Sequence, residues 1–210
     1  AYTALVMGQI PVTVAEGFYY LVNARDTTSG NVIEDLDAVT DLDGAYADGS
    51  KVYWETHLNT KAGVEEAEPQ YRWEVKAATD STFTIRNFGY DAYMGNVTAN
   101  STPYTLVKDV ADAAQFQIGT SDVPGGFVFI RNNEVANGLH AASSNQAVVN
   151  WNVKGSFASA WKLVTVPGDV LAGMGEKCQE LRKQFAQKAL NDTLSKYFDL
   201  AKAAQAAGKS

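Results

Sequence analysis

The sequence predicts an all-β domain built from three similar units and followed by a C-terminal helical extension. The first observation is a change of composition at Pro167-Gly168. Before this point, aromatic and β-branched residues occur in short runs separated by Gly, Asn, Asp, Ser and Thr, a pattern typical of many short strands. After it, the chain has no proline and is rich in Ala, Lys, Gln and Leu, which predicts helix.

The second observation is an internal repeat. Ile85-Arg86-Asn87 recurs 45 residues later as Ile130-Arg131-Asn132, and Leu21-Val22-Asn23 is a plausible first copy. An aromatic residue also closes each unit, at intervals of 43 and 45 residues: Trp73, Phe116 and Trp161. One such unit is too small to bury its aromatic residues alone, so three units of four strands are expected to close around a shared core. This arrangement is the β-trefoil.

The repeat also sets the expected domain boundaries. The first unit is longer than the others by about 20 residues, as the spacing of Asn23, Asn87 and Asn132 shows. The acidic segment Asp35–Ser50 is the expected insertion. We expect a lead-in strand over residues 1–16, the trefoil over residues 17–167 and the helical extension over residues 168–210.

The extension carries two apolar stripes. The first has helical spacing and comprises Leu171, Met174, Cys178, Leu181 and Phe185. The second is out of step with the first and comprises Leu190, Leu194, Tyr197 and Ala201. This mismatch predicts a break near Asn191-Asp192, and therefore one kinked helix or two helices. Since Cys178 lies on the first stripe, it is expected to be a buried structural thiol.

Composition argues against several classes of function. The 210 residues carry a net charge of −7, which disfavours nucleic acid as a partner, and no apolar run is long enough for a membrane span. One cysteine and two histidines leave little material for disulfides, zinc sites or histidine-dependent catalysis. The acidic segment lacks Asp and Glu at the end positions of a calcium loop. We therefore predict a protein that is not an enzyme, with no cofactor, no metal and no catalytic residues.

The closing aromatics resemble the Gln-X-Trp repeats of ricin-type (R-type) lectins. The runs 138–141, 148–151 and 158–161 are similar to trefoil-like modules of secreted Bacteroidetes proteins. This resemblance covers residues 17–166. It implies non-catalytic carbohydrate binding by a secreted or cell-surface protein, with a glycan as partner. The alternative is a structural or protein-interaction module whose sugar pockets have degenerated and which orients a neighbouring domain of a longer protein.

The resemblance also implies where a sugar would bind. In these lectins an aromatic face stacks on the sugar ring, while carboxylates and amides bond its hydroxyls. In unit three, Trp151 matches the stacking aromatic and His140 falls at the position of the family's Asp. Asn150 and Asn152 flank Trp151 and offer amides. Ala158 and Ser159 replace the family's Asn-Gln pair.

The other two units differ in what they offer. Unit one has Trp54 as a second stacking candidate, Glu34 at the approximate Asp position and Gln70 as an amide. Unit two has Gly95 at the Asp position and no tryptophan on the corresponding strand, so it is expected to be degenerate. Burial of Trp54 and Trp151 would favour the scaffold interpretation over sugar binding.

Overall fold

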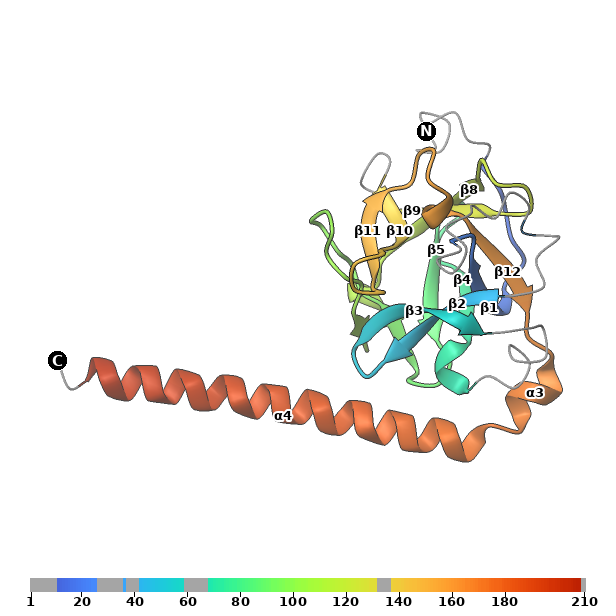
Figure 1. Cartoon of the computed structure of the whole chain (residues 1–210). Coiled ribbons are helices and arrows are strands. Elements are labelled where there is room, and N and C mark those ends of the chain that lie inside the picture. Colours follow the sequence, from blue (N-terminus) through green and yellow to red (C-terminus); the bar gives the residue numbers. More distant parts are fainter. Residues whose placement is uncertain (1–10, 26–35, 37–41, 59–67, 132–136, 209–210) are drawn as a thin grey trace.

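The computed structural model describes residues 11–25, 36, 42–58, 68–131 and 137–208. Within them the chain forms twelve strands and then a helical extension (Figure 1). The strands of unit one are β1 (Gly17–Asn23), β2 (Leu42–Asp48), β3 (Lys51–Leu58) and β4 (Trp73–Ala77). Those of unit two are β5 (Phe83–Asn87), β6 (Ala92–Met94), β7 (Leu106–Val107) and β8 (Phe116–Thr120). Those of unit three are β9 (Phe127–Arg131), β10 (Asn137–Ala141), β11 (Val148–Asn152) and β12 (Trp161–Thr165).

The pairing of these strands confirms the β-trefoil. The first and fourth strands of the three units form a closed antiparallel ring in the order β1-β4-β5-β8-β9-β12, and β12 returns to β1. The second and third strands of each unit form a hairpin: β2-β3, β6-β7 and β10-β11. Closure leaves the ring without an open edge, which removes the usual template for aggregation.

The three closing aromatics lie in the core, as the repeat predicted. Trp73, Phe116 and Trp161 begin β4, β8 and β12, and each is fully buried. The Nε1 atoms of the two tryptophans donate to backbone carbonyls, Trp73 to Ala45 at 2.9 Å and Trp161 to Leu139 at 3.1 Å. These bonds satisfy the one polar atom that each indole carries into the core.

The repeated asparagine has a structural role. Asn23 lies opposite Trp161, and Asn87 lies opposite Trp73. Each buried Asn Nδ2 donates to the carbonyl three residues before its closing tryptophan, Ala158 at 3.0 Å and Gln70 at 2.8 Å. Both carbonyls belong to short 3-10 turns that precede the closing strand. The asparagine therefore pairs backbone oxygen atoms of these turns that no strand ladder reaches.

The extra length of unit one is not confined to the predicted segment. Residues Leu42–Asp48, inside the predicted insertion, form β2 and pair with β3. β2 and β3 have 7 and 8 residues, against 3 and 2 in the corresponding strands of unit two, so part of the extra length extends a hairpin. The rest lies in the connections before β2 and after β3. The predicted lead-in strand is reduced, over residues 11–16, to one bridge between Pro11 and Gly119.

The predicted break near Asn191-Asp192 is wrong. Helix α3 (Gly168–Ala172) ends at Gly173, and α4 runs without interruption from Gly175 to Ala207. The two apolar stripes are out of step with each other because they have different surroundings. The first stripe contacts the trefoil, whereas the second extends past it.

The first part of α4 is docked on the trefoil. Cys178 and Phe185 are buried, as predicted for the first stripe, and burial raises the pKa of the Cys178 thiol. The Phe185 ring meets that of Tyr90 edge to face, with centroids 5.9 Å apart. Arg182 donates to the Phe88 carbonyl at 3.2 Å. These contacts fix the direction in which the helix leaves the domain.

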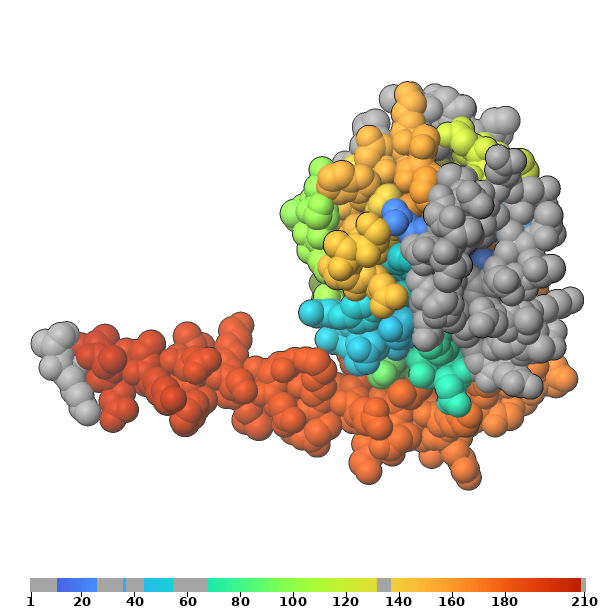
Figure 2. Space-filling view, in the orientation of Figure 1, coloured from blue at the N-terminus to red at the C-terminus, as the bar shows by residue number. Residues whose placement is uncertain are grey.

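The second part of α4 projects from the domain as a single rod (Figure 2). Its large apolar side chains are all more than half exposed: Leu190, Leu194, Tyr197, Phe198 and Leu200. None of the described helices is long and apolar enough to cross a membrane.

Candidate functional site

A pocket of about 300 Å³ lies on unit three, where the β10-β11 hairpin meets the end of β1. Its described wall carries one indole, one imidazole, one guanidinium, three hydroxyls and one side-chain amide. The described lining residues are Arg25, Ser101, His140, Ala142, Ser143, Ser144, Asn145, Val149 and Trp151. A pocket of this size is at the lower end of the range for small-molecule sites.

The register of the hairpin decides which side chains face the pocket. Gly138 is opposite Trp151, and His140 is opposite Val149. Directly opposed residues of an antiparallel pair point to the same face, so His140, Val149 and Trp151 share one side of the hairpin. Gly138 has no side chain to cover the indole. Trp151 is 42% exposed, with its ring centroid 6.4 Å from that of His140.

The same alternation overturns the predictions for Asn150 and Asn152. As strand neighbours of Trp151, they point to the opposite face of the hairpin. Asn150 is fully buried, accepts a hydrogen bond from the Tyr104 hydroxyl at 3.2 Å and donates to the Ala99 carbonyl at 3.4 Å. Asn152 is exposed, and its Oδ1 accepts from the backbone amide of Lys154. Neither residue faces the pocket.

His140 is held as a neutral imidazole. Its Nδ1 lies 2.8 Å from the hydroxyl of Ser159, which is fully buried. Burial, and secondarily the positive charge of Arg25, lower the pKa of His140 to about 4. Ser159, which replaces a polar residue of the lectin pattern, thus keeps a polar role, because it positions the imidazole.

As the pH is lowered, the free energy of unfolding should fall more steeply in the native chain than in a variant without His140. The folded-state pKa of about 4 lies below the usual value of 6.5, so the unfolded chain takes up the proton first. The contribution of the neutral ring is complete above pH 6.5 and is lost as the pH falls toward 4. After allowance for partial solvent screening, we expect a loss of about 1–2 kcal/mol.

Urea unfolding at pH 7.5 and pH 4.5 measures this effect. The drop in the free energy of unfolding should be smaller in a His140→Gln variant than in the native chain. The comparison removes the contribution of carboxylates that titrate in the same pH range, because both chains carry them. Equal drops in both would show that His140 is not desolvated.

Arg25 was not singled out by the sequence, yet it forms one side of the pocket. Its Cζ lies 5.7 Å from the ring centroid of Trp54 and 5.7 Å from that of Phe157. Burial lowers the pKa of the guanidinium. Its backbone amide donates to Asn23 Oδ1 at 2.9 Å, which fixes the chain where it leaves β1.

Trp54 is not a sugar platform, contrary to the prediction for unit one. It is 1% exposed, and its Nε1 donates to the Ala142 carbonyl at 2.9 Å. Its backbone amide donates to the Gln146 carbonyl, so the turn between β10 and β11 covers it. The indole instead packs against the guanidinium of Arg25, which lines the pocket.

The remaining predicted residues lie elsewhere. Gln70 belongs to the 3-10 turn Pro69–Tyr71. This turn lies beside Gly89, since a Cβ placed on Gly89 would be 3.0 Å from the backbone nitrogen of Gln70. The same Cβ would be 2.8 Å from the Leu181 side chain of α4. Gln70 is therefore next to the docked helix and does not line the pocket. Glu34 lies outside the described residues. In unit two, Gly95 is buried, so this unit offers no polar side chain at the Asp position.

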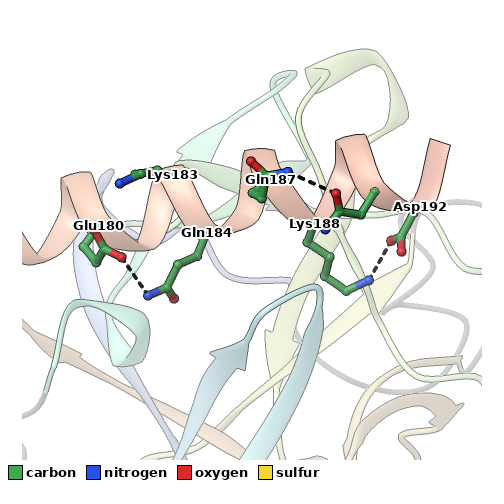
Figure 3. A pocket seen from close by; sticks show the side chains of 7 residues that line it. Glu180, Lys183, Gln184, Gln187, Lys188 and Asp192 are labelled. Atoms are coloured by element: carbon green, nitrogen blue, oxygen red, sulfur yellow. Dashed lines mark hydrogen bonds and ion pairs between the residues drawn. The ribbon is translucent and has the colours of Figure 1, made fainter. Parts of the chain in front are cut away.

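A larger hollow of about 460 Å³ lies beside α4 but lacks the features of a site (Figure 3). All seven of its described lining residues are exposed and come from this one helix. Six of them bond to one another in three pairs spaced four residues apart: Gln184 with Glu180, Gln187 with Asn191, and Lys188 with Asp192. Groups on one convex face do not converge on a ligand, so we interpret this hollow as a solvated helix surface.

The described residues contain no group of three or more His, Cys, Asp or Glu side chains placed to hold a metal ion. Of the acidic segment, Asp37 and Asp41 lie outside the described residues. Asp48 is exposed at the end of β2.

Comparison with known proteins supports the fold. No protein-family model matches the chain, and no curated protein matches it in sequence. Among solved structures, the Polyporus squamosus lectin bound to Neu5Acα2-6Galβ1-4GlcNAc is 14% identical, with a TM-score of 0.50 over 72% of this chain and 50% of the lectin. The Macrolepiota procera ricin B-like lectin, in complex with lactose, is 12% identical, with a TM-score of 0.49 over 73% of this chain and 99% of the lectin.

One neighbour is an enzyme. The GlcNAcα1-4Gal-releasing endo-β-galactosidase of Clostridium perfringens is 16% identical, with a TM-score of 0.50 over 71% of this chain and 33% of the enzyme. At these identities the similarity to the Polyporus lectin and to the endo-β-galactosidase bears on the fold alone, and the strand pairing shows this fold to be a β-trefoil. Function must be argued from the site.

Proposed function

We propose that this chain is a non-catalytic carbohydrate-binding module whose site is the pocket on unit three. The observation that carries the proposal is the half-exposed indole of Trp151 on the rim of a pocket lined with hydroxyls and an imidazole. The apolar C–H face of a sugar ring would stack on the indole. His140 and the serine hydroxyls would bond its hydroxyl groups.

The neutral state of His140 suits this role. A neutral imidazole has one donor and one acceptor nitrogen, and Nδ1 is already bonded to Ser159. The second ring nitrogen remains for a sugar hydroxyl. With one stacking contact and a few hydrogen bonds, we expect a Kd near millimolar for a monosaccharide, about −4 kcal/mol.

Replacing Trp151 by alanine should weaken glycan binding at least about tenfold, because the stacking surface is lost. A glycan array identifies the ligand, and tryptophan fluorescence then gives its Kd. The fluorescence is informative because three of the four tryptophans are buried: Trp54, Trp73 and Trp161. A change on titration therefore reports mainly on Trp151.

Tyr197→Ala is the matched control, since Tyr197 is also an exposed aromatic but lies on the projecting part of α4. This variant should bind as the native chain does. Equal affinity of the Trp151→Ala variant and the native chain would refute the proposed site. Absence of binding across a broad array by the folded native chain would refute carbohydrate binding.

A second candidate function is favoured by one observation, the apolar row on the projecting part of α4. Five large side chains exposed on one short segment are unusual for a surface that contacts only water. Here the trefoil would be a scaffold that presents α4 to a neighbouring domain of a longer protein. A failed glycan array, with the pocket intact, would favour this function. A secreted or cell-surface location would suit either candidate.

A further inference from the structure

The pocket contains one permanent positive charge and no described negative charge. Of its described lining residues, only Arg25 is ionised at neutral pH, because the imidazole of His140 is uncharged there. No carboxylate among the described residues forms an ion pair with Arg25. An arginine that is partly withdrawn from water normally has such a partner, since desolvation of a charge is costly.

The surroundings of Arg25 hold the cation without neutralising it. Its guanidinium is placed against the rings of Trp54 and Phe157, and both are fixed by the core of the domain. These contacts attract a cation weakly, and no side-chain N–H of Arg25 has an acceptor among the described residues. Its buried Nε atom has no hydrogen-bond partner in the part of the chain that the structure describes. Within the described residues, the planar fork of N–H donors is therefore preorganised and has no acceptor, and it lines the same pocket as the indole of Trp151.

We propose that the ligand of this pocket is an acidic saccharide, with its anionic group on Arg25 and its ring on Trp151. The inference rests on the proposed function and adds the class of ligand. A carboxylate or sulfate would accept two parallel hydrogen bonds from the guanidinium and supply a counter-charge that the described residues do not provide. A neutral sugar would enter the same pocket but add no negative charge beside Arg25. The shared chemistry is an anionic oxygen group on a pyranose.

Matched methyl glycosides test this inference on the full chain. The neutral probes are methyl β-galactoside and methyl β-glucoside, and the carboxylate probes are the corresponding 6-uronides. The 6-sulfates of the same glycosides form the third arm, and N-acetylneuraminate provides a carboxylate on a different ring. Titrations followed by tryptophan fluorescence at low and high salt give each Kd.

We expect the native chain to bind at least one acidic probe at least about tenfold more tightly than its neutral counterpart. High salt should reduce this preference, because the contact is between charges. The Arg25→Gln variant should lose the preference, measured as the ratio of the Kd values for the neutral and the acidic probe. The Arg25→Lys variant should keep part of it, because lysine retains the charge but not the planar fork. Circular dichroism confirms that both variants are folded.

Each outcome decides between the two proposals. Equal affinity for acidic and neutral probes, unchanged by Arg25→Gln, would overturn the inference and leave carbohydrate binding standing. A preference that persists in Arg25→Gln would also overturn it, because another group would be responsible. No binding of any probe by the native chain would overturn the inference, and the broad glycan array would then decide whether carbohydrate binding stands. A preference for uronides over sulfates, or the reverse, would identify the anionic group.

Discussion

Replacement of Gly138 by alanine is expected to destabilise the protein by more than about 3 kcal/mol or to prevent folding. A Cβ at this position would overlap the carbonyl oxygen of Phe129, and it would lie 2.8 Å from the carbonyl carbon and 3.1 Å from Ile130 Cα. These are backbone atoms of β9, which cannot move aside as a flexible side chain could. β10 must therefore shift from β9, and it carries His140 with it.

Chemical denaturation measures the loss of stability, and titration of a bound glycan measures the loss of the pocket. Gly168→Ala is the matched control, since a Cβ there meets nothing within 4 Å and the residue begins α3. This control should change the free energy of unfolding by less than about 0.5 kcal/mol. If both variants were equally stable, the close approach of β10 to β9 would be refuted.

The Trp161→Ala change is expected to cost about 3–5 kcal/mol, because it leaves a cavity where the three units meet. It also leaves the Leu139 carbonyl without the indole N–H that it accepts from at 3.1 Å. Trp161→Phe separates these effects. It keeps most of the ring volume and removes the donor, so we expect a smaller cost of about 1–2 kcal/mol.

Unit two provides the natural precedent, since Phe116 occupies the corresponding position and is equally buried. Guanidinium unfolding of both variants, with near-ultraviolet circular dichroism as the probe, gives the comparison. A phenylalanine variant as unstable as the alanine variant would show that the hydrogen bond to Leu139 outweighs ring packing.

The fold could be predicted because its signals are periodic and local. Three units with a common period require a common structure, and the closing aromatics mark where each unit enters the core. The separate helical extension was also visible in composition. The position of the helix break was not, because the change of stripe beyond Phe185 reflects the end of the trefoil surface. Gly173 marks the actual end of α3.

The site was only partly predictable, for a physical reason. Trp54 and Trp151 occupy hairpins of similar position, but the turn between β10 and β11 covers Trp54, and this contact joins distant parts of the chain. Arg25 reaches the pocket because closure of the barrel brings the end of β1 beside unit three. No local pattern signals either event. The orientation of Asn150, in contrast, follows from strand alternation next to Trp151.

The pairing of β1 with β12 has a consequence for the response of this domain to mechanical force. The two strands are antiparallel, with Tyr19 opposite Thr165 at one end and Asn23 opposite Trp161 at the other. Tension on the chain before β1 and after β12 therefore acts along the hydrogen bonds and breaks them one at a time, as in a zipper, and does not shear them all together. A pull from the far end of α4 must first detach Phe185 and Cys178 from the trefoil, so the docked helix protects the β1-β12 pair from this force.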